Sequence, residues 1–167
     1  MQILDNVLSE KRFDKLYESI TDHSFPWHLQ TSGVSVPGDG RYQFTHQFCD
    51  PRGARSPFDS LMEPMYYRLG VNKLYRCKVN LTLKTKKTCV FFPFHTDISF
   101  ADGLIKPFDY STAIFYLNTN NGYTLFEDGT KVNSVANRMV RFNGDTLHTG
   151  ATQTDERFRF VLNINYW

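Results

Sequence analysis

Hydrophobic and polar positions alternate most regularly at the end of the chain, from Arg157 to Tyr166. A period of two residues predicts a β-strand whose side chains point alternately to opposite faces. One face would carry Phe158, Phe160, Leu162 and Ile164, and the other Arg157, Arg159, Val161, Asn163 and Asn165. We therefore expect the first face to contact the hydrophobic core and the second to line a site.

A longer period, typical of helices, marks two segments in the N-terminal part of the chain. Ser9 would cap a helix over residues 10–21, whose apolar stripe consists of Phe13, Leu16, Tyr17 and Ile20. A second helix is predicted over residues 57–69 and would end at Gly70, although Pro64 must start a new segment or kink it. Both helices would cover the apolar outer face of the sheet.

Candidate metal ligands occur in one short run and again about fifty residues later. Residues 88–97 are aromatic and β-branched, which favours extended backbone, so His95 and Asp97 would point to the same face. The run 138–143 and the turn after it would bring His148 to the start of a neighbouring segment. Two imidazoles and one carboxylate form the ligand set of non-heme Fe(II) sites that keep coordination positions open.

Two basic residues, Arg157 and Arg159, follow His148 closely and suggest a cosubstrate that carries a carboxylate. Each feature alone has an ordinary explanation. A His-x-Asp triplet arises by chance, a lone histidine is commonly hydrogen-bonded within the fold, and a lone arginine is commonly solvated or ion-paired. The ordered combination on predicted strands is what favours a functional site.

From His95 to Trp167 the sequence resembles the catalytic core of the 2-oxoglutarate- and Fe(II)-dependent dioxygenases, particularly the prolyl 4-hydroxylase-like branch. Residues 113–118 resemble the strand after the His-x-Asp turn, and residues 122–129 resemble the Gly-Gly-x-Leu element, with Asn121 in place of one glycine. The resemblance implies a mainly β protein, a double-stranded β-helix (jelly roll, cupin-like) with N-terminal helices packed on one sheet.

The resemblance also implies how the cosubstrate is held. The tyrosine at the position of Tyr116 shares the distal carboxylate of 2-oxoglutarate with a basic residue in that family. In the phytanoyl-hydroxylase-like pattern the basic residue is an arginine eleven residues after the histidine, which ranks Arg159 first. Prolyl hydroxylase-like members with a shorter connection would instead point to Arg157. Asn80, on the strand before the metal turn, is a candidate contact for the inner carboxylate, and an ordinary strand asparagine is the alternative.

Length and composition favour one domain over residues 1–167, with helical support and entrance loops in 1–70 and the jelly-roll catalytic core in 71–167. The net charge of +2, without a basic stripe carrying aromatic residues, argues against a nucleic-acid partner. No apolar run of membrane-spanning length and no leader is evident. Three cysteines without paired spacing predict reduced thiols and a soluble protein in the reducing cytoplasm.

The region between the two predicted helices, residues 22–55, is rich in aromatic, glycine and proline residues and would supply edge strands and entrance loops. Substrate selection commonly resides in loops on a rigid scaffold. Candidates for lid or substrate contacts are Trp27, His28, His46 and Arg52, each with a structural role as the alternative.

The implied activity is that of an Fe(II)- and 2-oxoglutarate-dependent dioxygenase that uses O2 to hydroxylate an unactivated C–H bond and releases succinate and CO2. Ascorbate is a further candidate cofactor, and the substrate would be a small molecule or a peptide, such as a peptidyl proline or another amino acid. Two alternatives stay open, a non-oxygenase metal-binding cupin-like protein and a non-catalytic jelly-roll binding module. Nucleobase demethylation is less favoured because Asn163 and Asn165 stand where that branch has a second arginine.

Overall fold

The computed structural model describes residues 1–31, 42–91, 93–98 and 110–167 of the chain. Its strands are β1 (Gln2–Leu4), β2 (His28–Gln30), β3 (Gln43–Cys49), β4 (Leu74–Leu83), β5 (Ser111–Tyr116), β6 (Tyr123–Phe126), β7 (Lys131–Asn133), β8 (Arg138–Asn143), β9 (His148–Ala151) and β10 (Phe158–Tyr166). Its helices are α1 (Glu10–Thr21), the short 3-10 helix η1 (Asp59–Met62) and α2 (Glu63–Leu69).

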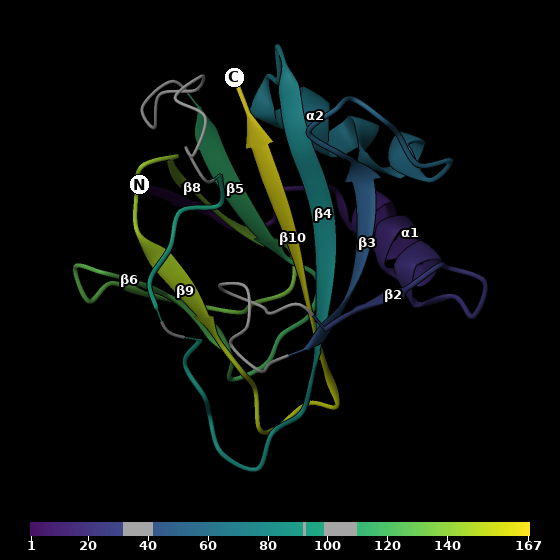
Figure 1. Cartoon of the computed structure of the whole chain (residues 1–167). Helices are drawn as coiled ribbons and strands as arrows, with labels where there is room; N and C mark the ends of the chain where they lie inside the picture. Colours follow the sequence, from purple (N-terminus) through teal and green to yellow (C-terminus); the bar gives the residue numbers. More distant parts are fainter. Residues whose placement is uncertain (32–41, 92, 99–109) are drawn as a thin grey trace.

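The strands form two antiparallel sheets (Figure 1). The larger sheet has the order β1-β8-β5-β10-β4-β3-β2, and the smaller one has the order β7-β6-β9. In the larger sheet β10 lies between β4 and β5, so the strand with the clearest alternation has a partner on both sides. This mainly β architecture with supporting helices confirms the predicted jelly roll.

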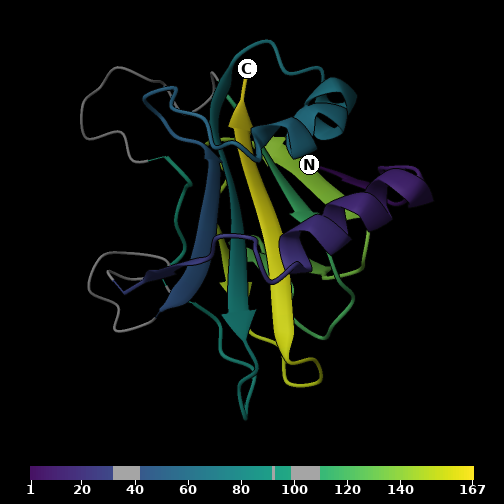
Figure 2. The ribbon, with the colours of Figure 1, turned by 90° about the vertical axis from the view of Figure 1, so that its right-hand side faces the viewer.

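The main hydrophobic core lies between the larger sheet and the helices, which both cover the same face of that sheet (Figure 2). Phe160, Leu162 and Ile164 of β10 are all buried in it, as their alternation predicts. The ring of Tyr17 from α1 meets Phe160 edge-on, with 6.0 Å between the centroids. Phe158 differs from the prediction, because it is the first residue of β10 and is 44% exposed.

Helix α1 begins and ends where the sequence predicts. Ser9 occupies the N-cap position, but its backbone carbonyl rather than its side chain accepts the first hydrogen bonds of the helix. The second predicted helix is divided into η1 and α2, with Pro64 at the start of α2, where its missing amide hydrogen costs nothing. Gly70 ends α2 in the left-handed conformation. No helix in the described part of the chain is both long and apolar enough to cross a bilayer.

The predicted strand over residues 88–97 is wrong as a continuous element. In its described residues only isolated bridges form, from Val90 to Ala151 and from His95 to His148. Pro93 has no amide hydrogen to donate, which interrupts the hydrogen-bond ladder between the bridges. The three cysteines are free, as predicted. Part of the predicted entrance region, residues 32–41, lies outside the described residues.

Candidate active site

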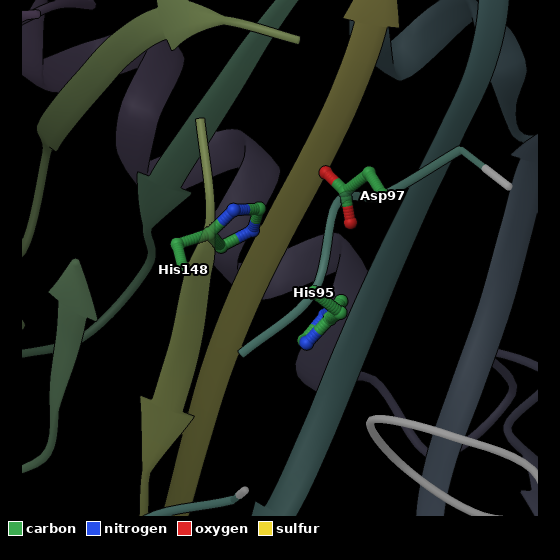
Figure 3. A group of neighbouring side chains, drawn as sticks. All are labelled: His95, Asp97 and His148. Carbon is green, nitrogen blue, oxygen red and sulfur yellow. The ribbon is translucent and has the colours of Figure 1, made fainter. Parts of the chain in front are cut away.

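Three side chains, His95, Asp97 and His148, form a cluster whose ligand atoms all lie within 4.8 Å of one another. They face a common space in front of β10 (Figure 3). The backbones of the two histidines exchange hydrogen bonds, with the amide of each donating to the carbonyl of the other at 3.0 and 3.1 Å. Asp97 follows His95 by two residues, so this short bridge brings all three side chains together.

The surroundings of the two histidines suit metal binding. Nδ1 of His148 lies 3.0 Å from the carbonyl oxygen of Thr146. A carbonyl only accepts, so Nδ1 donates to it, and Nε2 is the ring nitrogen left for a metal. Burial, and next the neighbouring His148, lower the pKa of His95. Nδ1 of His95 is buried without a hydrogen-bond partner in the described chain, as a group awaiting a ligand would be.

The carboxylate of Asp97 is held by three donors. Arg76 forms an ion pair with it at 3.1 Å, and the amides of Asn165 and Asn163 donate to it at 3.0 and 3.4 Å. Burial alone would raise the pKa of Asp97, but the positive charge of Arg76, then His148, and the hydrogen bond from Asn165 outweigh it and lower that pKa. The carboxylate is therefore anionic at neutral pH and could serve as a metal ligand. This donor set, two imidazoles and one carboxylate, fits a ferrous ion.

Sequence reasoning missed two basic residues of this site, Arg76 and Lys78. Both lie on β4, and both line the cavity beside the cluster. The signal that would have found them is the same alternation that was used for β10, because Arg76, Lys78, Asn80 and Thr82 share one face while the intervening Cys77, Val79 and Leu81 are buried on the other.

A cavity of about 290 Å³ opens between the two sheets and contains the cluster. Its lining is largely polar and consists of Gln30, Gln43, Arg76, Lys78, Asn80, Thr82, Phe91, His95, Thr96, Asp97, Ile114, Thr124, His148, Thr149, Gly150, Arg159, Val161 and Asn163. Such a volume suits a small molecule or the side chain of a peptide.

The structure separates the two candidate arginines. Arg159 lines the cavity and is only 5% exposed, and its Nε donates to Oγ of Ser134 at 2.9 Å. Within the described residues no carboxylate forms an ion pair with it. Burial lowers the pKa of Arg159 to about 10, so the side chain remains charged at neutral pH. Arg157 is exposed outside the cavity, just before β10 begins.

The other two predicted cosubstrate contacts differ in their access to the cavity. Asn80 lines it, and the Oδ1 atom of this side chain is buried without a hydrogen-bond partner in the described chain. Tyr116 is fully buried behind the lining, and its hydroxyl donates to Oγ1 of Thr124 at 2.8 Å. Thr124 itself lines the cavity, and the guanidinium of Arg159 lies over the Tyr116 ring at 5.8 Å from its centroid. A direct contact of Tyr116 with a cosubstrate stays a prediction.

The predicted lid and substrate contacts are not among the residues that line the cavity. His46 is buried in the core, where its ring nitrogens bond to the carbonyl of Pro26 and to the hydroxyl of Ser56. Trp27 donates to a backbone carbonyl of α1, while His28 and Arg52 are exposed elsewhere. The residues of this region that reach the cavity are Gln30 of β2 and Gln43 of β3.

Comparisons with solved structures identify the fold. A viral collagen prolyl hydroxylase from Paramecium Bursaria Chlorella virus-1, in complex with 2-oxoglutarate, matches 99% of this chain and 94% of its own, with a TM-score of 0.64 and 14% identity. A 2OG-Fe(II) oxygenase family oxidoreductase from Burkholderia pseudomallei matches 98% of this chain and 84% of its own, with a TM-score of 0.63 and 14% identity. No protein-family model and no curated protein sequence matches the chain.

A third similar structure widens the range of reactions. It is a non-heme alpha-ketoglutarate-dependent epimerase of nogalamycin biosynthesis, which matches 98% of this chain and 76% of its own, with a TM-score of 0.61 and 15% identity. The chain therefore has the fold of the 2OG-Fe(II) oxygenases, prolyl hydroxylases included, as the sequence resemblance predicts. A fold hosts several reactions, so the reaction has to be argued from the site.

Proposed function

We propose that this protein is an Fe(II)- and 2-oxoglutarate-dependent dioxygenase that hydroxylates an unactivated C–H bond. His95, Asp97 and His148 would hold the metal, and Arg159 would bind the distal carboxylate of 2-oxoglutarate. The substrate would be a peptidyl prolyl residue or another amino-acid compound. The similar structures that support this include a prolyl hydroxylase in complex with a peptide fragment from Trichoplax adhaerens. Ascorbate has no support in these comparisons and is not part of the proposal.

The observation that carries the proposal is the buried charge of Arg159. A buried guanidinium without a carboxylate partner is costly, because burial removes its hydration. The Nε atom has a neutral partner in Ser134, and no carboxylate among the described residues neutralises the charge of the guanidinium. A carboxylate bound in the cavity would supply the missing charge through two parallel hydrogen bonds.

The spacing between Arg159 and the cluster agrees with a short diacid. Nη1 of Arg159 lies 3.9 Å from the position that a Cβ atom on Gly150 would occupy. Gly150 follows His148 by two residues on β9, which is about 7 Å along a strand. A five-carbon chain with a carboxylate at each end has a comparable length, so one end can meet the guanidinium while the other end reaches the metal ligands.

A ferrous ion bound by the three ligands would supply the oxygen activation that couples conversion of 2-oxoglutarate to succinate and CO2 with oxidation of the substrate. The contribution of the chain is positioning. Arg76, Asn163 and Asn165 keep Asp97 anionic and fix its orientation. Arg159 and the cavity hold the cosubstrate away from bulk water, where a charge-assisted hydrogen bond is stronger.

The proposal is tested by anaerobic titration of the protein with Fe(II) and then with 2-oxoglutarate, while the metal-to-ligand absorption of the chelate is recorded. We expect the band in the wild-type protein and in Arg157→Gln, whose side chain lies outside the cavity. Arg159→Gln should weaken 2-oxoglutarate binding by roughly 10- to 100-fold and leave metal binding intact, because charge-assisted bonds are lost.

Two results would contradict the proposal. Unchanged 2-oxoglutarate affinity in Arg159→Gln would favour a non-oxygenase metal-binding protein. A folded wild-type protein that binds neither ligand would favour a non-catalytic binding module. With binding established, a search for a 16-dalton mass gain over a peptide and amino-acid panel would identify the substrate.

A further inference from the structure

Lys78 places a second unmatched positive charge in the cavity. It lies on the same face of β4 as Arg76 and Asn80, and all three side chains line the cavity. The charge of Arg76 is matched by its ion pair with Asp97. Lys78 has no hydrogen bond or ion pair with its ammonium group anywhere in the described chain. Its charge is therefore available to a ligand.

The register of the sheet separates Lys78 from the end of the cavity where Arg159 lies. Arg159 is directly opposite Thr82, whereas Lys78 is opposite Asn163, one of the residues that donate to Asp97. Thr82 follows Lys78 by four positions on β4, a distance of about 13 Å along the strand. Lys78 thus lies at the level of the metal ligands, and an anion beside it is a different one from the carboxylate at Arg159.

The charges of the lining point to a further anion. Among the described residues, the lining has three cationic side chains, Arg76, Lys78 and Arg159. It has one acidic side chain, Asp97. With a divalent ion and the doubly negative 2-oxoglutarate in place, two positive charges remain in excess. Burial, and next the charge of Arg76, lower the pKa of Lys78 to about 8, so its amine still carries a proton at neutral pH. A cavity with this excess favours a negatively charged occupant.

We propose that Lys78 binds a carboxylate of the substrate beside the metal ligands, so that the substrate belongs to the carboxylic acids. This inference rests on the proposed function, in which the opposite end of the cavity is taken by 2-oxoglutarate. It makes Lys78 a residue that determines specificity, because a neutral analogue of the substrate would leave the charge of this half-buried side chain unpaired.

The test compares benzoate with benzamide, which have similar shapes and differ in charge. The protein is loaded with Mn(II), whose paramagnetism broadens the NMR lines of any small molecule near it, and with saturating 2-oxoglutarate, which blocks Arg159. We expect benzoate lines to broaden several-fold more than benzamide lines in the wild-type protein. Lys78→Gln should remove this preference and Lys78→Arg should retain it. Lys86→Gln, which removes an exposed lysine beyond β4, should behave as wild type.

The Mn(II) and 2-oxoglutarate affinities of each sample are measured first, by calorimetric titration. If neither ligand binds to the folded wild-type protein, the proposed function fails and this inference fails with it. If both bind but benzoate and benzamide behave alike, or Lys78→Gln keeps the preference for benzoate, only the carboxylate site is refuted. A tenfold or greater loss of 2-oxoglutarate affinity in Lys78→Gln would assign Lys78 to the cosubstrate and also overturn the inference.

Discussion

Gly122 sets the position of Arg159, and Gly122→Ala is the sharpest test of that arginine's role. A Cβ atom added at Gly122 would lie 2.7 Å from Cδ and 2.9 Å from Nε of Arg159. Carbon atoms in contact lie about 3.5–4.0 Å apart, so the arginine would have to move by roughly an ångström. It has little freedom to do so, because its Nε is bonded to Ser134 and the side chain is 5% exposed.

The magnitude follows from these contacts. Inserting a carbon into packed surroundings costs about 1–3 kcal/mol of folding stability. A displaced guanidinium would also lose its alignment with the cosubstrate carboxylate. Hydrogen bonds to charged groups contribute about 1.5–3 kcal/mol, so we expect Gly122→Ala to raise the Kd for 2-oxoglutarate by roughly 10- to 100-fold. Metal affinity should stay within a few-fold of wild type, since the cluster is not touched.

The assay pairs urea unfolding with anaerobic 2-oxoglutarate titration of the Fe(II)-loaded protein. Gly129→Ala is the control. A Cβ atom added at Gly129 would meet no atom within 4 Å and so would not displace Arg159, although the φ of 86° makes the substitution strained. Strain at a positive φ should cost it about 1 kcal/mol of stability without changing cosubstrate affinity. If Gly122→Ala binds 2-oxoglutarate as tightly as Gly129→Ala does, Arg159 is not the carboxylate ligand.

Three further outcomes are expected. Asp97→Ala should abolish Fe(II) retention, measured by metal analysis after desalting, and retention at wild-type stoichiometry would refute the ligand assignment. In the Fe(II)-loaded protein, 2-oxoglutarate at 100 times its own Kd should stabilise the fold by about 2.7 kcal/mol. Thermal unfolding under argon should show this as a rise in Tm of several degrees, and an unchanged Tm would count against the site. The metal-free protein should lose stability as the pH falls from 7.5 to 5.5. Burial holds the pKa values of His46 and His95 below their usual range, so in this pH range the unfolded chain binds more protons than the folded chain does. A urea midpoint that stays constant or rises on acidification would contradict this.

The fold could be predicted where one face of an element is apolar and the other polar. The alternation in β10 and the helical stripe of α1 give their element types and the faces that meet in the core, and β8 has the predicted bounds of 138–143. The second predicted helix is divided at Pro64. The sequence allowed Pro64 either to start a new segment or to kink the helix, and in the structure it lies in the first turn of α2. Residues 88–97 look like a strand by composition, but one imino acid, Pro93, prevents a continuous ladder.

The site was predictable where its chemistry depends on residue type and order. The two histidines, Asp97 and Arg159 are brought to one cavity as expected. The alternation along β4 groups Arg76 and Lys78 with Asn80 on its polar face, but a polar face of a strand usually meets water, and the position of the smaller sheet shows that this one is enclosed. For His46, a candidate substrate contact with a structural role as the alternative, the structure shows the structural role, because both of its ring nitrogens find partners in the core.

The electrostatics of the cavity and the stability of the fold are therefore connected. A cation buried only for structure is normally paired, as Arg76 is with Asp97. Arg159 and Lys78 instead have pKa values lowered chiefly by burial, which means that their charged forms destabilise the ligand-free protein. Each cation lies at a different end of the same cavity, so bound anions can remove both penalties at once. In the proposed assignment, the two anions of this cavity are thus the ones that complete its charge balance.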